Sequence, residues 1–387
     1  MRKSVVLILF ILMIIFVVLL SFVSTRIWGG KGEEIPDKIE IKVDDSMTFM
    51  EFAKANNIQN KALKEIFKLK SQKDLIKKIP TLKLTDVEIS NRVNKFAALH
   101  AEEESKNWYK IFPKFVLWVT FLFIVFRLFV SKKITARKRI ILYGISIVIF
   151  GVIMGSDPSP MGTIKDAVYL LGKSGVVFFP RLIALVVFLL MVVLANKFIC
   201  SWGCQFGVFQ DFIFRINRNK KDTKGIFRQY KIPFVITNSV RILVFAGMFV
   251  TAFVWVMDLF EHFDPFKIFK PGVIAWIGGS FIGILLIASL FVYRPWCHFF
   301  CPFGLFGWLF EKLSIYRIRV DYDKCIDCGA CEKACPSTVM SAILRKNKKV
   351  IPDCFSCSSC VEVCPSEAVH LSAKKPANPL PHALGKK

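Results

Sequence analysis

The sequence predicts a multi-pass α-helical membrane protein with a small α+β domain near its C-terminal end. Three observations lead to this fold class. Hydrophobic residues make up 54% of the 387 residues and are gathered in long runs. Lysine and arginine are concentrated in alternate loops between these runs. Eight of the 12 cysteines lie between residues 325 and 364, in two copies of one short pattern.

Six apolar runs approach the length of about 20 residues that a helix needs to cross a bilayer. They cover residues 5–23, 112–130, 140–155, 182–199, 233–257 and 273–292. No cleavage site of small residues follows the first run, so residues 1–29 are expected to form an uncleaved N-terminal anchor. Residues 111–313 are expected to form the membrane domain.

The net charge of +25 could indicate a nucleic-acid-binding protein, but its distribution indicates a membrane topology instead. Basic residues fill the loops after the second and fourth runs, whereas the loops at 156–181 and 258–272 mix both signs. Short loops rich in lysine and arginine stay in the cytoplasm. The pattern predicts a protein of the cytoplasmic (inner) membrane with both termini inside, in contact with lipid and without a nucleic-acid partner.

Residues 30–110 are predicted to form a small extracytoplasmic helical domain. This segment contains no cysteine. Thr48 and Glu51 have the spacing of a capping box, in which each side chain accepts a hydrogen bond from the backbone of the other, and therefore predict the start of a helix. Beyond the last cysteine, residues 373–387 are expected to form a flexible tail.

Both copies of the C-terminal pattern have the spacing C-x₂-C-x₂-C-x₃-C-P, which is typical of bacterial two-cluster ferredoxins. Three closely spaced thiolates wrap one [4Fe–4S] cluster, and the fourth cysteine reaches the other cluster. Residues 314–372 are therefore predicted to be a two-cluster ferredoxin-like domain, because a disulfide framework or a zinc site would have a different context or spacing. The expected ligands are Cys325, Cys328, Cys331 and Cys364 for one cluster, and Cys354, Cys357, Cys360 and Cys335 for the other.

The remaining four cysteines form two C-x₃-C motifs, Cys200 with Cys204 and Cys297 with Cys301. Each motif follows an apolar run, precedes a Phe-Gly pair and comes after a loop that contains Asp-Pro. This likeness predicts an internal repeat of helix pairs, with both motifs close together at the cytoplasmic ends of their helices. Their thiols could hold a third cluster or another metal, form redox-active dithiols, or pack in the reduced form.

Taken together, the motifs resemble those of the membrane polyferredoxins of the NosR, NapH and YccM type, over roughly residues 112–370. The resemblance implies a membrane-bound iron–sulfur protein that passes electrons between the quinone pool and a partner reductase or ferredoxin-type subunit. Two features depart from the family pattern. Gln205 stands where proline is usual, and residues 30–110 lack a flavin-attachment sequence, so a NapH-like protein without covalent flavin is closer.

Four single residues are further candidates. Arg241 lies inside the fifth run, where a charge suggests a role at a quinone or a cluster unless the side chain snorkels to the interface. His262 and Asp264 follow this run and could carry protons from a quinol or could be solvated. His298 lies inside the second C-x₃-C motif and could be a ligand or a proton donor. The runs contain no histidine pair, so a bis-histidine haem is not expected.

Functions from different classes remain open on this evidence. The chain could be an electron-transfer component that oxidises quinol. It could instead be an accessory protein that reduces a metal ion such as copper, as related oxidase accessory proteins do, or that maintains the cofactor of a respiratory enzyme. It could also be a membrane anchor for partner subunits. The sequence indicates no individual catalytic side chain.

Overall fold

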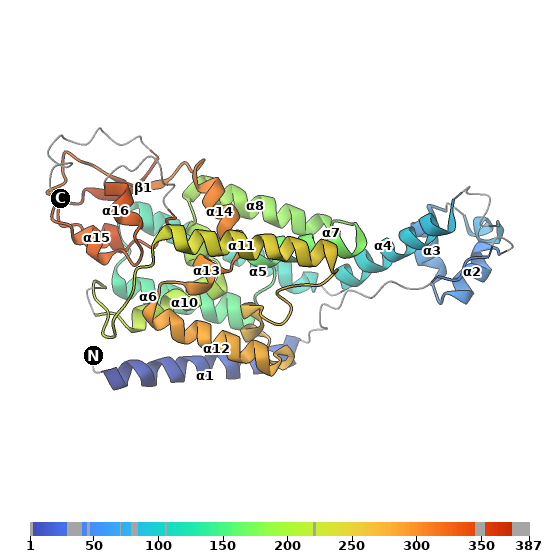
Figure 1. Ribbon diagram of the computed structural model, residues 1–387, viewed down its shortest axis with the longest axis horizontal. Coiled ribbons are helices and arrows are strands. Elements are labelled where there is room, and N and C mark those ends of the chain that lie inside the picture. The colour runs from blue at the N-terminus through green and yellow to red at the C-terminus, as the bar shows by residue number, and fades with distance from the viewer. Residues whose placement is uncertain are drawn as a thin grey trace. The chain divides into compact units, whose positions relative to one another are not determined.

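Figure 1 presents the computed structural model of the chain. It describes residues 3–28, 41–44, 47–69, 71–78, 84–104, 107–219, 222–344 and 353–373. The chain divides into two compact units. The larger one comprises Met1–Gly30, Trp108–Tyr169 and Phe179–Lys387, and the smaller one comprises Lys31–Asn107 and Leu170–Phe178. Apart from its first residue, the tail expected at 373–387 lies outside the described residues.

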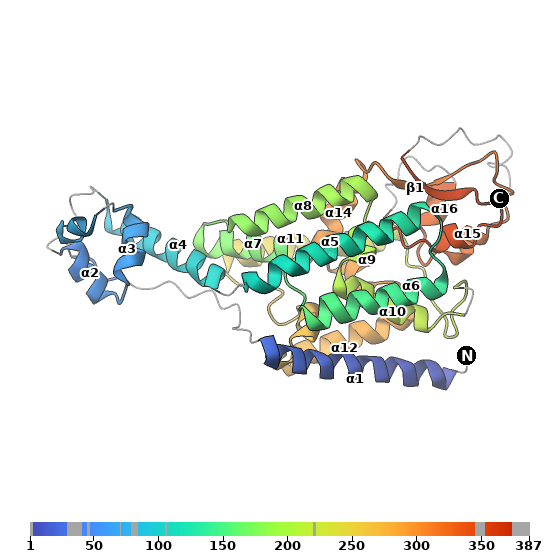
Figure 2. The same cartoon turned by 180° about the vertical axis from the view of Figure 1, so that it is seen from behind.

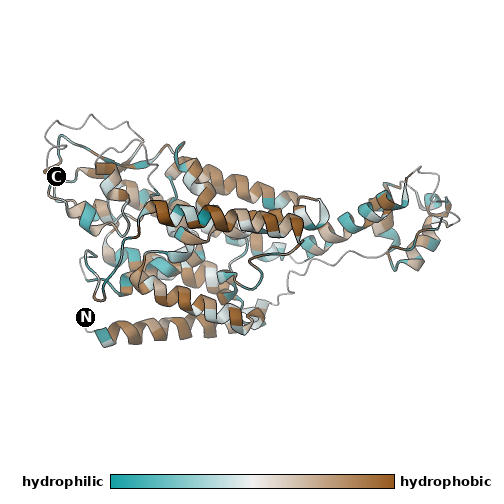
Figure 3. Cartoon of the chain, viewed as in Figure 1, coloured by the Kyte–Doolittle hydropathy of each residue, from teal (hydrophilic) through white to brown (hydrophobic). Residues whose placement is uncertain are grey.

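Each of the six apolar runs forms a helix in the larger unit. These helices are α1 (Lys3–Trp28), α5 (Trp108–Val130), α6 (Ala136–Ile145) with a π-helical continuation η3 (Ser146–Ile153), α8 (Phe179–Ala195), α11 (Phe234–Val254) and α12 (Trp276–Phe291). By length and composition, α1, α5 and α11 can cross a membrane, whereas α8 and α12 are apolar but shorter. Figure 3 shows the apolar residues that run along these helices, as expected of a membrane protein.

The chain does not leave the bundle where α8 and α12 end. After α8 it turns back through the short helix α9 (Phe198–Trp202) and continues as α10 (Gln205–Ile216). After α12 it turns back in the same way through α13 (Pro295–Phe299) and continues as α14 (Pro302–Glu311). We call the segments α9–α10 and α13–α14 the two re-entrant hairpins.

Aromatic contacts show how far the re-entrant hairpins reach into the bundle. The ring centroid of Trp296 lies 5.7 Å from that of Phe260, and Phe206 lies 5.9 Å from Phe266. Phe260 and Phe266 belong to the loop after α11, whereas Lys231, just before α11, bonds to the ferredoxin domain. The 21 residues of α11 cover about 31 Å. The hairpins therefore extend well away from the end of α11 that adjoins the ferredoxin domain.

This geometry corrects two expectations. The fourth apolar run does not continue as one helix to residue 199, because Asn196 has a positive φ of 62° and α8 ends at Ala195. The C-x₃-C motifs consequently lie in the turns of the re-entrant hairpins and not at the predicted cytoplasmic ends of spanning helices. Hydropathy detects an apolar run but does not detect a reversal of chain direction within it.

The ferredoxin domain is built around a two-stranded antiparallel sheet. Strands β1 (Arg317–Val320) and β2 (Val369–Ser372) pair with Arg317 opposite Ser372, and the sheet joins the first segment of the domain to the last. Three short helices lie between the strands in sequence: α15 (Ala330–Ala334), α16 (Val339–Leu344) and α17 (Ser359–Glu362). The third cysteine of each run lies in a helix, Cys331 in α15 and Cys360 in α17.

The smaller unit is helical. It contains α2 (Phe49–Ala55), α3 (Asn60–Phe67), η1 (Gln72–Ile76), α4 (Asp86–Glu104) and the end of α7 (Pro160–Ser174). The predicted capping box at the start of α2 is confirmed. Thr48 N–H donates to Glu51 Oε2 at 2.9 Å, and Glu51 N–H donates to Thr48 Oγ1 at 3.3 Å. Phe49, Phe52, Leu63 and Phe67 form the centre of its apolar core.

Two glycines close the re-entrant hairpins, and their substitution tests this part of the fold. A Cβ added at Gly207 would lie 2.8 Å from Cys200 O, and one at Gly304 would lie 2.7 Å from Cys297 O. We expect Gly207→Ala and Gly304→Ala each to destabilise the protein by about 1–3 kcal/mol, as overpacking does. The measurement is the unfolding temperature of the detergent-purified protein.

Gly283→Ala is the matched control for these variants, because no atom lies within 4 Å of a Cβ added in that part of α12. A helix-interior glycine replaced by alanine without a clash should leave stability unchanged or raise it. Equal unfolding temperatures for all three variants would contradict the tight closure of the hairpins.

Candidate metal centres

The eight C-terminal cysteines line two hollows in the ferredoxin domain. Each hollow takes three cysteines from one run and the fourth from the other run, which is the crossed arrangement that the spacing predicts. One hollow, the outer hollow, is lined by Cys325, Cys328, Cys331 and Cys364. The other, the inner hollow, is lined by Cys354, Cys357, Cys360 and Cys335.

The backbone has the same conformation in both runs. The residues on either side of the second cysteine adopt positive φ values, which are uncommon for residues other than glycine. They are Asp327 (51°) and Gly329 (66°) around Cys328, and Ser356 (53°) and Ser358 (73°) around Cys357. These left-handed residues curl each run around its hollow, so that three cysteines of the same run line it.

The hollows suit a cluster better than a single metal ion. Among the described residues, no group of three or more His, Cys, Asp or Glu side chains is gathered closely enough to hold one ion. Sulfurs around a tetrahedral zinc lie roughly 4 Å apart, because Zn–S bonds are about 2.3 Å long. A [4Fe–4S] cluster takes one thiolate at each of four irons and therefore needs a wider ring of cysteines.

The other four cysteines form a separate group, here called the tetracysteine site. Cys200, Cys204, Cys297 and Cys301 are each at most 9% exposed. The thiols of Cys200, Cys204 and Cys301 all lie within electrostatic range of the Cys297 thiol. The two re-entrant hairpins thus bring both C-x₃-C motifs together inside the larger unit.

The two motifs have the same local structure. Cys204 N–H donates to Ile199 O at 2.8 Å, and Cys301 N–H donates to Trp296 O at 3.0 Å. Cys204 and Cys301 then precede α10 and α14 with extended backbone conformations. The internal repeat that the sequence predicts is therefore also a repeat of backbone geometry at the cysteines.

Two buried arginines bind the first cysteine of each motif. Arg294 Nη1 donates to Cys200 O at 2.6 Å, and Arg241 Nη1 donates to Cys297 O at 3.4 Å. Both side chains are fully buried, and neither Nε–H has a hydrogen-bond partner among the described residues. A buried charge is costly unless it is compensated. Asp211 compensates Arg294 at 2.6 Å and Asp353 lies 3.5 Å from Arg241, so the capacity that the two arginines leave unused is that of their Nε–H donors.

A loop of the ferredoxin domain, residues 353–356, packs against the tetracysteine site. Asp353 contacts the ammonium group of Lys197 and lies 3.5 Å from Arg241 Nη2. Trp202, in the first motif, donates its indole N–H to Ser356 O at 3.1 Å. These contacts involve both halves of the repeat. Lys197 precedes the first motif and Trp202 belongs to it, whereas Arg241 binds the second motif.

The position of this loop shows which of the two hollows lies next to the tetracysteine site. It carries Cys354, whose N–H donates to the Glu311 carboxylate at 3.1 Å, and Phe355, whose ring lies 4.1 Å from Lys197 Nζ. The inner hollow is therefore the neighbour of the tetracysteine site, whereas Cys328 of the outer hollow is exposed.

The predicted candidates Arg241 and His298 both lie at this junction. Arg241 does not snorkel, because it is fully buried and its Nη2 donates to Asn238 Oδ1 at 2.9 Å. His298 Nδ1 lies 3.4 Å from Asp353 Oδ2, and its Nε2 has no partner among the described residues. Both side chains thus contact the loop that carries Cys354.

The other two candidates lie elsewhere. His262 is exposed in the loop after α11. Asp264 caps the short helix η4 (Pro265–Phe269) by accepting a hydrogen bond from Phe266 N–H at 2.9 Å, and it lies 3.5 Å from Lys165 Nζ. The structure therefore brings neither residue to the tetracysteine site.

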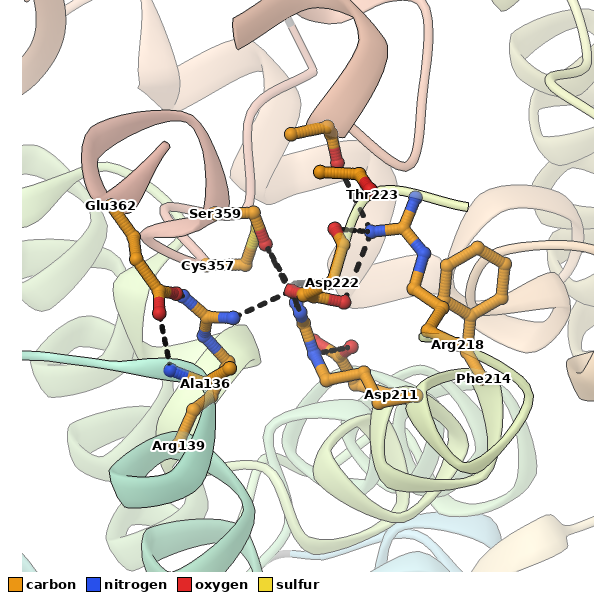
Figure 4. A network of polar contacts seen from close by, with 12 residues as sticks. Ala136, Arg139, Asp211, Phe214, Arg218, Asp222, Thr223, Cys357, Ser359 and Glu362 are labelled. Atoms are coloured by element: carbon orange, nitrogen blue, oxygen red, sulfur yellow. Dashed lines mark hydrogen bonds and ion pairs between the residues drawn. The ribbon is translucent and has the colours of Figure 1, made fainter. Parts of the chain in front are cut away.

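Figure 4 shows a second buried contact between the membrane bundle and the ferredoxin domain, centred on Asp222. Its carboxylate binds Arg139 at 2.6 Å, Arg218 at 3.1 Å and also Arg215. Ser359, in the ferredoxin domain, donates to the same carboxylate at 3.0 Å. Burial alone would raise the pKa of Asp222, but the arginines lower it below its usual value. Asp222 is therefore an ionised anchor for the domain.

No local pattern predicts the charged residues at the junction of the two domains, namely Asp222, Arg294, Lys197 and Asp353. The basic residues around Asp222 were expected to be a topology signal, whereas Arg215 and Arg218 are buried in ion pairs. One signal was present. Lys197 and Arg294 each lie three residues before the first cysteine of a motif, so the repeat itself marks them as equivalent positions.

Asp222→Asn tests the role of this anchor. Removing the charge leaves buried arginines without their partner, which typically costs about 3–5 kcal/mol. We expect the ferredoxin domain to loosen from the bundle, so that amide hydrogens of residues 353–373 exchange faster in the purified protein. Asp323→Asn, at an exposed position of the same domain, is the control and should not change the exchange. Unaltered exchange in Asp222→Asn would rule out an anchoring role.

Comparison with known proteins points to the same groups of cysteines. A family described as a 4Fe-4S dicluster domain matches residues 318–371. A family described as a 4Fe-4S binding domain matches twice, at residues 177–224 and 274–319, and each match contains one C-x₃-C motif. No solved structure matches the chain.

Three curated relatives are similar to part of the chain. YccM of Escherichia coli, named as an electron transport protein, is 27% identical over 176 residues, which are 41% of this chain and 46% of YccM. The ferredoxin-type protein NapH of Haemophilus influenzae is 28% identical over 160 residues, 40% of this chain and 52% of NapH. An uncharacterised protein of Methanocaldococcus jannaschii is 22% identical over 163 residues, 41% of this chain and 58% of that protein.

The chain thus spans about half the length of the curated relatives that it matches. The matches to the two 4Fe–4S families contain the ferredoxin cysteine runs and both C-x₃-C motifs. On these grounds the chain is similar to the polyferredoxins of the NapH and YccM type and contains 4Fe–4S binding domains.

Proposed function

We propose that the chain moves electrons between the quinone pool and a partner redox protein, using two [4Fe–4S] clusters in the ferredoxin domain and a third iron–sulfur centre at the tetracysteine site. The observation that carries this proposal is the position of residues 353–356. In this loop Asp353 and Ser356, on either side of Cys354 of the inner hollow, contact Lys197, Trp202 and Arg241 around the two C-x₃-C motifs. The three cysteine sites then form one series from the interior of the bundle to the exposed Cys328.

The proposed ligands are the cysteines that line each site. When bound, iron–sulfur clusters supply one-electron transfer, with potentials that depend on charge, hydrogen bonds and exposure. The protein residues hold the sites in order. Asp353, bound by Lys197 and Arg241, keeps the inner hollow beside the tetracysteine site, and Asp222 holds the domain at a second point. Stepwise electron transfer requires that each iron–sulfur site lies next to the following one.

The electrostatics favour a cluster over reduced, packed thiols at the tetracysteine site. Asp211 and Asp353 compensate Arg294 and Arg241, but the Nε–H groups of both arginines have no partner among the described residues, and neutral thiols are weak acceptors for them. A cluster held by four thiolates is anionic and can accept hydrogen bonds at sulfur. The unpartnered Nε–H groups of both arginines are donors of the kind that such a group would take.

The proposed topology has both termini and the ferredoxin domain in the cytoplasm and residues 30–110 outside. The alternation of basic loops supports it. The structure adds that α1 begins at the same end of the bundle as the ferredoxin domain, since Lys3 Nζ lies 5.8 Å from the Phe227 ring, near the start of α11. Electrons would accordingly pass between the membrane and a cytoplasmic partner at the outer hollow.

Iron analysis of the full-length protein tests the third centre. The anaerobically purified parent should contain more than the roughly eight irons of two [4Fe–4S] clusters. Cys200→Ser and Cys301→Ser should each lose the excess iron, because the two residues come from different motifs but serve one site. Both variants should retain the EPR signals of the reduced ferredoxin clusters.

Ser289→Ala is the control, since among the described residues this buried serine in α12 bonds to Leu285 O of its own helix. It should have the iron content of the parent. A parent that contains about eight irons, and that the cysteine variants match, would exclude the third centre and leave the packing or dithiol alternatives.

A further inference from the structure

One aromatic side chain of the ferredoxin domain, Phe355, contacts both the inner hollow and the surroundings of the tetracysteine site. It directly follows Cys354, it is 4% exposed, and it is one of the residues that line the inner hollow. Figure 2 shows α9, which carries part of the first C-x₃-C motif, on the side of the bundle that adjoins the ferredoxin domain. Phe355 is thus part of the wall of the inner hollow, and one peptide bond joins it to a proposed cluster ligand.

Two cations from equivalent positions of the internal repeat lie over this ring. Lys197 Nζ lies 4.1 Å and Arg294 Cζ 5.1 Å from the ring centroid. Lys197 is three residues before Cys200, and Arg294 is three residues before Cys297. A cation within about 6 Å of an aromatic ring centroid is attracted to the ring, and the attraction is stronger when both are buried. Each half of the repeat thus contributes one cation to the same phenylalanine.

The ring also reaches each C-x₃-C motif by a short series of contacts. Arg294 Nη1 donates to Cys200 O at 2.6 Å, so the guanidinium joins the ring to the first motif. His298, whose ring centroid lies 5.1 Å from that of Phe355, directly follows Cys297 of the second motif. One side chain therefore separates the ring from each motif, and its own backbone joins it to the inner hollow.

We propose that the Phe355 ring is the bridge through which an electron passes between the inner hollow and the tetracysteine site. The inference rests on the proposed function, because it needs a redox centre at each of the two sites. The step moves one electron from the reduced centre to the oxidised one, so that one site is oxidised, the other is reduced, and no bond or proton changes. Electron tunnelling is faster through packed atoms and hydrogen bonds than across a gap. The ring fills the gap that a smaller side chain would leave.

A second set of contacts offers a rival route between the same two sites. Ser356 N–H donates to Cys354 Sγ at 3.5 Å, and Ser356 O accepts the Trp202 indole N–H at 3.1 Å. This route reaches the first motif, because Trp202 lies within that motif, but it has no contact with the second. The Phe355 ring contacts residues from both halves of the repeat and is therefore the more complete connection.

Four substitutions separate the two routes from a general effect of packing. Phe355→Leu removes the ring but keeps most of the apolar volume, and Phe355→Ala leaves a cavity between the two sites. Trp202→Phe removes the indole N–H of the rival route. Phe209→Leu is the matched control, because Phe209 is also fully buried, but its ring lies 6.4 Å from that of Phe269 in the loop after α11.

The test uses the anaerobically purified full-length protein in detergent, mixed rapidly with titanium(III) citrate and frozen after increasing delays for EPR. This soluble reductant meets the exposed outer hollow first, so electrons reach the buried tetracysteine site through the inner hollow. We expect Phe355→Leu to delay the signal of the third centre severalfold and Phe355→Ala to delay it more. The signals of the ferredoxin clusters should appear at the parent rate in both variants.

The other variants and a second measurement serve as controls. Phe209→Leu should match the parent, and Trp202→Phe should cause a smaller delay than Phe355→Leu. Amide hydrogen exchange of residues 353–373 should stay at the parent level in Phe355→Leu, because the contacts of Asp222 and Asp353 with the bundle remain. A delay at unchanged exchange is an effect on electron transfer and not on the attachment of the domain.

The outcomes distinguish the bridge from the proposed function. If the third-centre signal appears at the parent rate in Phe355→Leu, the ring is not the bridge, and the proposed function stands. Faster exchange in Phe355→Leu would make the ring a docking contact, an equal delay in Phe209→Leu would make the effect one of packing, and a longer delay in Trp202→Phe would favour the rival route. Each of these results overturns the inference. A parent that shows only the signals of the ferredoxin clusters lacks the third centre, which overturns the proposed function as well.

Discussion

The arrangement of the protein depends on burying charge at the junction of two domains. Asp353 lies between Lys197 and Arg241 inside an otherwise apolar bundle. In such surroundings an unpaired charge is expensive, and breaking a pair costs more than the pair contributes when formed. The ferredoxin domain is therefore fixed to the membrane domain by contacts that cannot be removed one at a time without leaving a buried ion. Cys354 is the next residue, so the same contacts set the position of the inner hollow.

The internal repeat gives the junction its form. Two equivalent turns bring their cysteines together, and each turn is bound through the carbonyl of its first cysteine by a buried arginine. The arginines differ in origin, because Arg294 precedes the second motif whereas Arg241 comes from α11. Asp211 compensates Arg294 at 2.6 Å, and Asp353 lies 3.5 Å from Arg241. Of the two arginines, Arg241 therefore pairs with a carboxylate of the ferredoxin domain, whereas Arg294 pairs with a carboxylate of the bundle and contacts the domain through the Phe355 ring.

Much of this architecture was predictable from local sequence signals. The six helices follow from apolar runs, the crossed cysteine sets follow from ferredoxin spacing, and the capping box at Thr48 follows from a four-residue pattern. The likeness of the two C-x₃-C segments also predicted that Cys200, Cys204, Cys297 and Cys301 would meet. Each of these signals lies within a short stretch of chain, or in a comparison of two stretches.

The rest depends on contacts between distant residues, which no local pattern records. A positive φ at Asn196 ends α8 early, and the apolar residues after it resemble a continuation of the same helix. The partners of Asp222 include Arg139, and Asp353 pairs with Lys197, so the sequence shows only separate charges. Gln205 likewise stood out only as a departure from a family pattern. Its buried, unpartnered oxygen becomes visible once α5 and α8 are packed around it.

The central claim is that three iron–sulfur centres lie in series from the bundle interior to the ferredoxin surface. The most direct measurement is the anomalous scattering of the anaerobically purified protein at the iron absorption edge. The account predicts three separate peaks: one at the outer hollow, one at the inner hollow and one enclosed by Cys200, Cys204, Cys297 and Cys301. Two peaks confined to the ferredoxin domain, with the four buried thiols in contact with one another or joined as disulfides, would contradict it.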